Sequence, residues 1–176
     1  RQILKSMENL ESLIKTYYDF PKKGIAFKDI LGIIQDPEVF RELIFKMSSN
    51  NLIKNSEAII SIEARGFIFG SAISLQASKP MLLARKPGKL PGELIQENYD
   101  LEYGKNSLSI QKESLKRFSS YAIVDDLLAT GGTVNCVANL IKKNGREVCG
   151  LVTVVELMEL NGRSKFNFPV ESILSL

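Results

Sequence analysis

The sequence contains no histidine among its 176 residues. This absence excludes Ser-His-Asp and Cys-His nucleophile systems, histidine general bases and histidine-ligated metal sites. Cysteine is almost as scarce, because Cys136 and Cys149 are the whole complement. Two thiols are too few for a zinc site of four sulfurs, and a secreted disulfide framework would normally carry more. We therefore expect buried thiols in a reducing cytosol, and proton transfer by carboxylate, lysine, tyrosine or main-chain groups.

Dense basic runs and long apolar runs are also missing. The 23 basic and 20 acidic residues give a formal net charge of +3, and the basic residues are spread along the chain, unlike a nucleic-acid-binding arm. No apolar stretch approaches the ~20 residues needed to span a bilayer. The first residues, 1–5, lack the apolar core of a signal peptide. We expect a cytoplasmic protein that binds neither nucleic acid nor membrane.

What is present indicates one globular α/β domain over residues 1–176. The apolar fraction of 44% and the charged fraction of 24% are ordinary for such a domain. Short apolar runs predict strands at 58–62, 80–84, 121–124 and 148–155. Helices are predicted at 67–77 and 133–143. Strands that alternate with helices predict a mainly parallel central sheet with helices on both faces.

Three further segments are predicted with less regular patterns. Apolar residues at helical spacing indicate an amphipathic helix over residues 2–16. Asp36-Pro37 supplies an N-cap and a first-turn proline for a second helix. Residues 86–106 combine glycine, proline and many polar residues, which predicts a long irregular segment. Such segments inside compact domains are typically functional lids or disordered loops.

The strongest chemical signal is the stretch 122–133, Ala-Ile-Val-Asp-Asp-Leu-Leu-Ala-Thr-Gly-Gly-Thr. A buried strand leads to two adjacent carboxylates, Asp125 and Asp126, in a loop that ends at the next helix. The main-chain N–H groups of the turn can converge on an anion at that helix N-terminus. The turn comprises Ala129, Thr130, Gly131, Gly132 and Thr133.

Two aspartates beside a phosphate would repel it unless the ligand offers them hydroxyls or a divalent cation. A ribose 5-phosphate meets this condition, with its 2′- and 3′-hydroxyls on Asp125 and Asp126 and its phosphate in the turn. A plainer interpretation is that the aspartates merely cap a helix. That interpretation needs neither both acids nor the two glycines.

This strand, acid pair and glycine-containing turn resemble the fingerprint of the type I phosphoribosyltransferases. Four further segments occur in that family's order and spacing, at 20–30, 63–67, 85–92 and 99–104, and they are most similar to the branch whose acceptor is adenine. The resemblance covers nearly the whole chain. It implies the type I phosphoribosyltransferase fold, a small hood over about residues 1–35 and a mobile lid over about residues 86–106.

The resemblance also implies a reaction. The ribose 5-phosphate of phosphoribosyl pyrophosphate (PRPP) would pass to adenine, giving AMP and pyrophosphate in purine salvage. Mg²⁺ is the implied cofactor, held mainly through PRPP, and a homodimer is implied because basic groups in this family can reach the neighbouring subunit's site. Two alternatives stay open: a phosphoribosyltransferase for another purine, and a non-catalytic regulator that senses PRPP.

Residue roles follow from the same resemblance. Glu102 is expected to take a proton near N7 of adenine, and Tyr103 to cover the reacting centre and exclude water. The residues expected to bind pyrophosphate are Arg65, Arg85, Lys86 and Lys89. The residues expected to bind adenine are Phe27 and Leu127, on the two ring faces, and the main chain of Ala26 and Lys28, on its edge.

Overall fold

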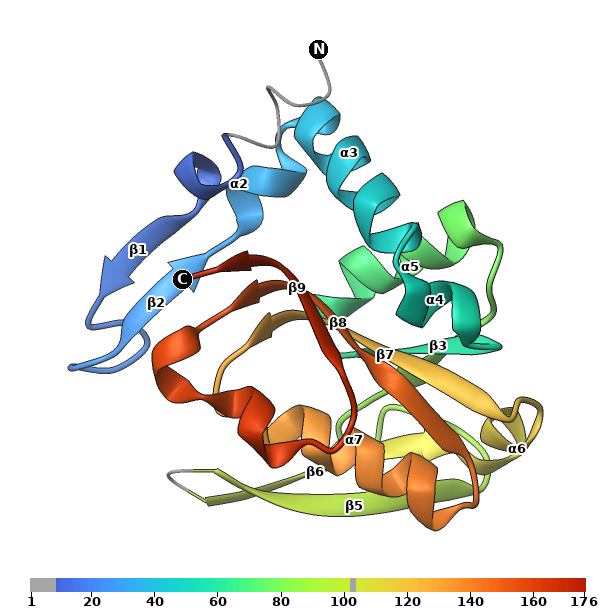
Figure 1. Cartoon of the computed structure of the whole chain (residues 1–176). Helices are drawn as coiled ribbons and strands as arrows, with labels where there is room; N and C mark the ends of the chain where they lie inside the picture. Colours follow the sequence, from blue (N-terminus) through green and yellow to red (C-terminus); the bar gives the residue numbers. More distant parts are fainter. Residues whose placement is uncertain (1–8, 102–103) are drawn as a thin grey trace. The chain divides into compact units, whose positions relative to one another are not determined.

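The computed structural model describes residues 9–101 and 104–176. Contacts within the chain divide it into two compact units, residues 1–46 and residues 47–176. Figure 1 traces both along the chain. Among the helices of the described residues, none is long and apolar enough to cross a bilayer.

The larger unit is built on a five-stranded sheet whose neighbouring strands are all parallel (Figure 1). In spatial order the strands are β4 (Met81–Ala84), β3 (Ala58–Ile62), β7 (Ser120–Leu128), β8 (Glu147–Glu156) and β9 (Val170–Ser175). Every residue of β3 is buried, as expected for a strand covered on both faces. The predicted α/β fold with a mainly parallel sheet is confirmed.

Helices cover both faces of this sheet. They are α4 (Asn51–Asn55), α5 (Gly66–Ala77) and α7 (Gly132–Lys143). Helices α4 and α5 lie on one face and α7 on the other (Figure 1). The apolar stripe of α7, which includes Val134, Val137 and Ile141, is buried in a cluster with Ile123 of β7 and Leu151 of β8. The spacing of three and four residues along α7 produces this stripe.

A two-stranded ribbon begins inside the segment 86–106, which was expected to be irregular. Strands β5 (Leu94–Leu101) and β6 (Gly104–Gln111) pair antiparallel, and the short helix α6 (Lys112–Lys116) follows. Ile95 and Tyr99 of β5 pack against the core cluster. The Nζ of Lys143, on α7, lies 2.8 Å from both carboxylate oxygens of Glu97. Polar residues hide the alternation of β5 in the sequence, and cross-strand pairing with packing on α7 orders it.

The smaller unit, taken by itself, holds a hairpin and helices. Its elements are η1 (Glu11–Leu13), β1 (Lys15–Tyr18), β2 (Ala26–Asp29), α2 (Leu31–Ile34) and most of α3 (Pro37–Ser48). Asp36 Oδ1 accepts the main-chain N–H groups of Glu38 and Val39, each at 3.1 Å, so the predicted N-cap is confirmed.

The helix predicted over residues 2–16 is wrong in its described part. Residues 1–8 lie outside the described chain, and residues 11–13 form only a 3₁₀ turn before the chain becomes extended at Lys15. Thr16 and the two following tyrosines favour a strand, and they pair with β2. Strand pairing therefore outweighs the helical spacing of the apolar residues.

Candidate functional site

The two adjacent aspartates lie on a strand rather than in a loop. Strand β7 continues through Asp125 and Asp126 to Leu128, because β8 pairs with it as far as Glu156. The prediction that the loop begins at Asp125 is therefore wrong. The extra strand residues hold both carboxylates on the rigid carboxyl end of a central strand, where open α/β sheets place their ligands.

Burial and mutual repulsion disfavour the charged forms of the two adjacent aspartates. Asp125 is half-buried and Asp126 is 5% exposed. Burial, together with the negative charge of Asp126, raises the pKa of Asp125 well above its usual range. Arg65 opposes this shift, and its Nε lies 2.6 Å from Oδ2 of Asp126. A ligand that brings hydroxyl donors or positive charge to these oxygens would stabilise both carboxylates.

The turn after β7 leaves a helix N-terminus open. Gly131, the N-cap of α7, has φ +87°, a left-handed conformation that favours glycine, and no side chain caps the helix there. The interpretation of the aspartates as caps of α7 is therefore wrong. The turn from Ala129 to Thr133 lines a cavity of about 80 Å³ together with Asp125. Uncapped N–H groups and the helix dipole favour an anion in this cavity.

A second cavity, of about 510 Å³, adjoins the first at the carboxyl edge of the sheet. It brings together six of the residues predicted to bind ligand: Arg65, Lys86, Asp125, Asp126, Leu127 and Thr133. Asp125, Leu127 and Thr133 line both cavities. Because the two cavities share these residues, one ligand can place a phosphate in the smaller cavity and its remaining groups in the larger.

Glu63 organises the basic side of the larger cavity. Its Oε1 accepts the main-chain N–H of Lys86 at 2.6 Å and lies 3.3 Å from Nε of Arg85. The peptide bond between Glu63 and Ala64 is cis. Lys86 lines the cavity, whereas Arg85 turns to Glu63, and Lys89 is exposed in the turn beyond. The structure thus places Arg65 and Lys86 at the cavity, while Arg85 supports the loop that carries Lys86.

Tyr99 and Asn106 line the larger cavity, and the sequence analysis did not single them out. They are directly opposite each other in the register of β5 and β6, so they share one face of the ribbon. The signal was the alternation of residues 94–101, which places Ile95 and Tyr99 on one face. An interpretation as a strand would have placed Tyr99 near the site.

The remaining predicted residues belong to the smaller unit or fall outside the described chain. Ala26, Phe27 and Lys28 belong to the smaller unit, on β2. The ring of Phe27 meets that of Phe20 edge-on, with centroids 5.1 Å apart, and Nζ of Lys28 donates to Thr16 Oγ1 at 2.8 Å. Glu102 and Tyr103 lie outside the described residues. In the part of the chain that the structure describes, no three carboxylate or thiol side chains cluster as metal ligands.

Comparisons with known proteins identify the family of this chain. A model of the phosphoribosyl transferase domain matches residues 33–170. Adenine phosphoribosyltransferase of Prochlorococcus marinus (strain MIT 9515) is 69% identical over 170 residues, 96% of this chain and 99% of that protein.

Solved structures give the same result. The crystal structure of adenine phosphoribosyltransferase from Thermoanaerobacter pseudethanolicus has a TM-score of 0.88 and 36% identity, and the match covers 97% of this chain and 99% of that one. The enzyme from Saccharomyces cerevisiae, complexed with adenine and an imino-altritol bisphosphate, has a TM-score of 0.87 and 33% identity, with coverage of 97% and 99%. This chain therefore belongs to the phosphoribosyltransferase family, in the branch of the adenine phosphoribosyltransferases.

Proposed function

We propose that this chain transfers the ribose 5-phosphate of PRPP to adenine, giving AMP and pyrophosphate in purine salvage. The observation that carries the proposal is the stretch 125–133, where an acid pair and an uncapped helix N-terminus line adjoining cavities. The N–H groups of the turn hold the 5′-phosphate. Asp125 and Asp126 accept hydrogen bonds from the ribose 2′- and 3′-hydroxyls, which relieves their mutual repulsion.

The pyrophosphate of PRPP belongs on the basic side of the larger cavity. Arg65 and Lys86 line that side, and Arg85 and Lys89 flank the same loop. As the bond from the anomeric carbon to pyrophosphate breaks, positive charge grows on the sugar and negative charge on the leaving group. The acid pair stabilises the first charge and the basic residues stabilise the second.

Adenine is the second reactant. We propose that the side chains of Phe27 and Leu127 contact its ring faces and that the main chain of Ala26 and Lys28 binds its edge. Its N9 forms the new bond to the anomeric carbon, and Glu102 accepts the proton that leaves N7. Tyr103 covers the reacting centre and excludes water, which would otherwise hydrolyse the sugar donor. The yeast relative crystallised with adenine supports the choice of base.

Mg²⁺ fits the residues present. It prefers oxygen ligands, and the carboxylates of Asp125 and Asp126 border the cavity proposed for PRPP. We propose that PRPP itself supplies most of the ligands, with these aspartates beside them. When bound, the cation supplies neutralising charge for the departing pyrophosphate.

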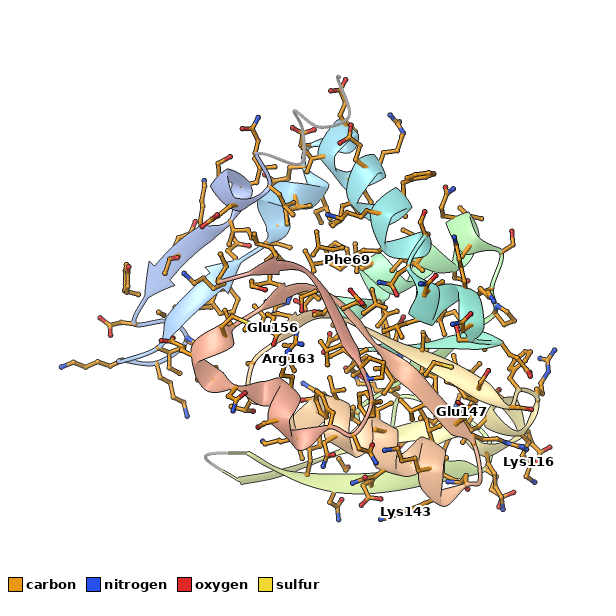
Figure 2. All side chains as sticks on the ribbon, viewed as in Figure 1. Phe69, Lys116, Lys143, Glu147, Glu156 and Arg163 are labelled. Atoms are coloured by element: carbon orange, nitrogen blue, oxygen red, sulfur yellow. The ribbon has the colours of Figure 1, made fainter. Side chains whose placement is uncertain are left out.

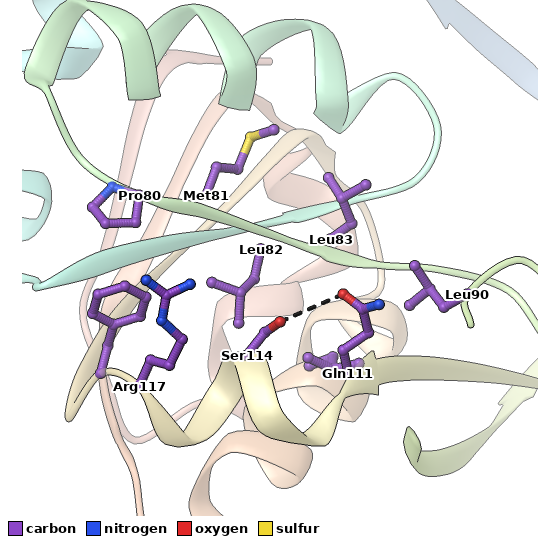
Figure 3. Close-up of a pocket in the computed structure, with 10 residues that line it drawn as sticks. Pro80, Met81, Leu82, Leu83, Leu90, Gln111, Ser114 and Arg117 are labelled. Atoms are coloured by element: carbon purple, nitrogen blue, oxygen red, sulfur yellow. Dashed lines mark hydrogen bonds between the residues drawn. The ribbon is translucent and has the colours of Figure 1, made fainter. Parts of the chain in front are cut away.

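We also propose a cytoplasmic homodimer made of a single domain over residues 1–176, with a hood at about 1–35 and a mobile lid at about 86–106. Strand β4 is an edge strand. Beside it lies a groove of about 340 Å³, lined by residues that include Met81, Leu82, Leu83 and Leu90 (Figure 3). A second subunit would cover this groove and bring the exposed Lys89 close to another site. Sedimentation velocity distinguishes monomer from dimer.

Turnover with three bases tests the function. Adenine, hypoxanthine and guanine are each supplied with PRPP and Mg²⁺, and nucleotide formation is followed by chromatography. We expect AMP formation to exceed formation of either oxopurine nucleotide by at least about 100-fold, since a polar edge left unpaired is strongly disfavoured. Preference for an oxopurine would overturn the adenine assignment. PRPP binding without any nucleotide formation would identify a regulator.

A further inference from the structure

The turn from Ala129 to Thr133, called the phosphate turn below, contacts a second main-chain segment, formed by the residues that follow β8. The main-chain N–H of Leu157 donates to the carbonyl of Leu128 at 2.9 Å. A Cβ added to Gly162 would lie 2.3 Å from the carbonyl oxygen of Ala129 and 3.2 Å from the nitrogen of Gly131. A Cβ added to Gly131 would lie 2.8 Å from the carbonyl oxygen of Gly162. The two main chains are therefore in direct contact, with no side chain between them.

A buried carboxylate holds the supporting segment in place. Glu156, the last residue of β8, is 1% exposed, and its Oε2 accepts Nε–H of Arg163 at 2.7 Å. The second guanidinium nitrogen, Nη2, donates to Oε1, and Ser172 Oγ on β9 donates to the same oxygen at 2.6 Å. Figure 2 shows Glu156 and Arg163 side by side. The hydrogen bonds from Arg163 lower the pKa of Glu156, so the pair stays charged.

This contact fixes Gly162 as well as Arg163. Arg163 lies in the 3₁₀ helix η3 (Gly162–Lys165), directly after Gly162. A planar guanidinium that makes two parallel hydrogen bonds has a defined orientation. The backbone of Arg163 is therefore held at a defined place relative to β8, and the adjacent Gly162 is held with it. Gly162 is the residue through which this segment meets the turn, because its main chain lies against Ala129 and Gly131.

We propose that Glu156 and Arg163 are positioning residues for the phosphate turn and act through the main chain of Gly162. By holding Gly162 against Ala129 and Gly131, they set the direction of the N–H groups that receive the 5′-phosphate. This inference rests on the proposed function, in which the turn from Ala129 to Thr133 binds that phosphate. It predicts that the pair controls affinity for the phosphate and leaves affinity for the rest of the nucleotide unchanged.

The test compares AMP with adenosine, which lacks the phosphate. Binding of each to the full chain is measured by calorimetric titration for wild type, Glu156→Gln and Arg163→Lys. Lysine keeps the charge but loses the paired hydrogen bonds. Both variants should bind AMP about tenfold more weakly than wild type, with unchanged adenosine affinity. In steady-state assays KM for PRPP should rise by a similar factor, with kcat nearly constant.

Lys143→Gln is the matched control. It removes a different ion pair, between Lys143 of α7 and Glu97, at the end of α7 remote from the phosphate turn, so it should leave AMP binding unchanged. Thermal melting confirms that each protein is folded at the assay temperature. If one variant does not fold, the other and Ser172→Ala carry the test, since Ser172 binds the same carboxylate.

The outcomes separate two kinds of failure. Equal losses for AMP and adenosine in the variants would show a purely structural pair and overturn the positioning role. Unchanged AMP binding in folded variants would overturn it too, while the proposed function would stand. If wild type bound AMP no more tightly than adenosine, the phosphate site itself would be wrong, and both proposals would fall.

Discussion

Asp125 and Glu156 occupy the carboxyl ends of neighbouring parallel strands, yet their environments have opposite effects. Burial and the adjacent Asp126 raise the pKa of Asp125, whereas hydrogen bonds from Arg163 lower the pKa of Glu156. The hydrogen-bond partners of Glu156, Arg163 and Ser172, belong to the chain itself. Asp125 faces a cavity beside a like charge. The difference shows how one sheet edge can hold one carboxylate for support and leave another for a ligand.

The largest effect is expected from Asp126→Asn. This change keeps the shape but removes the charge that lies 2.6 Å from Arg65 and, in our proposal, accepts a ribose hydroxyl. Charge-assisted hydrogen bonds are worth about 1.5–3 kcal/mol, so kcat/KM for PRPP should fall by about 100-fold. Steady-state kinetics measure it.

The control for this prediction is Glu113→Gln, which removes an exposed carboxylate paired with Lys116. It should leave kcat/KM unchanged. If Asp126→Asn kept nearly full activity, the acid pair would not be the sugar site.

The next effect is on stability, and Asp125→Asn should be more stable than wild type at neutral pH. Because the pKa of Asp125 is raised on folding, the native state binds its proton more tightly than the unfolded chain does. Its contribution to stability is therefore present below the unfolded pKa and is lost as pH rises through the folded pKa. Asparagine removes this loss.

Urea unfolding near pH 7.5 and near pH 4 measures the difference. The gain in the free energy of unfolding should be larger at pH 7.5, while activity falls. A variant that is less stable than wild type at pH 7.5 would contradict the raised pKa of Asp125 in the folded state.

The smallest effect, of opposite sign, is expected for Glu156→Gln. The pKa of Glu156 is lowered on folding, so its contribution is present above the unfolded pKa and is lost as pH falls through the folded pKa. The variant should lose about 1 kcal/mol at neutral pH, a modest value because one partner, Arg163, is partly exposed. Urea unfolding across the acid range should show the difference from wild type shrinking. A constant difference would contradict this sign.

Structure can be predicted from this sequence where the signal is contiguous. Residues 122–133 lie on one strand, one turn and one helix, so local periodicity and turn chemistry place the acids and the glycines together. The alternation of buried strands and amphipathic helices likewise predicts the parallel sheet. Long patterns of this kind average over many residues, and single exceptions do not disturb them.

Prediction from the sequence is wrong where contacts between distant segments determine the local structure. Residues 15–18 become a strand because β2 pairs with them. Residues 94–101 become a strand because β6 pairs with them and α7 packs against them. The contact between Gly162 and the phosphate turn joins segments about thirty residues apart, and no local sequence pattern in either segment predicts it. The same holds for Ser172 on Glu156, since its partner is set by the pairing of β8 with β9.

The meeting of Gly131 with Gly162 bears on how this enzyme can be re-engineered. With main chain against main chain, neither position has space for any other amino acid, and each constrains the other. A mutant library aimed at a different sugar phosphate should therefore keep both glycines constant. Diversity belongs at Thr130, which is exposed, and Thr133, which is half-buried, because their hydroxyl side chains can be exchanged without disturbing that junction.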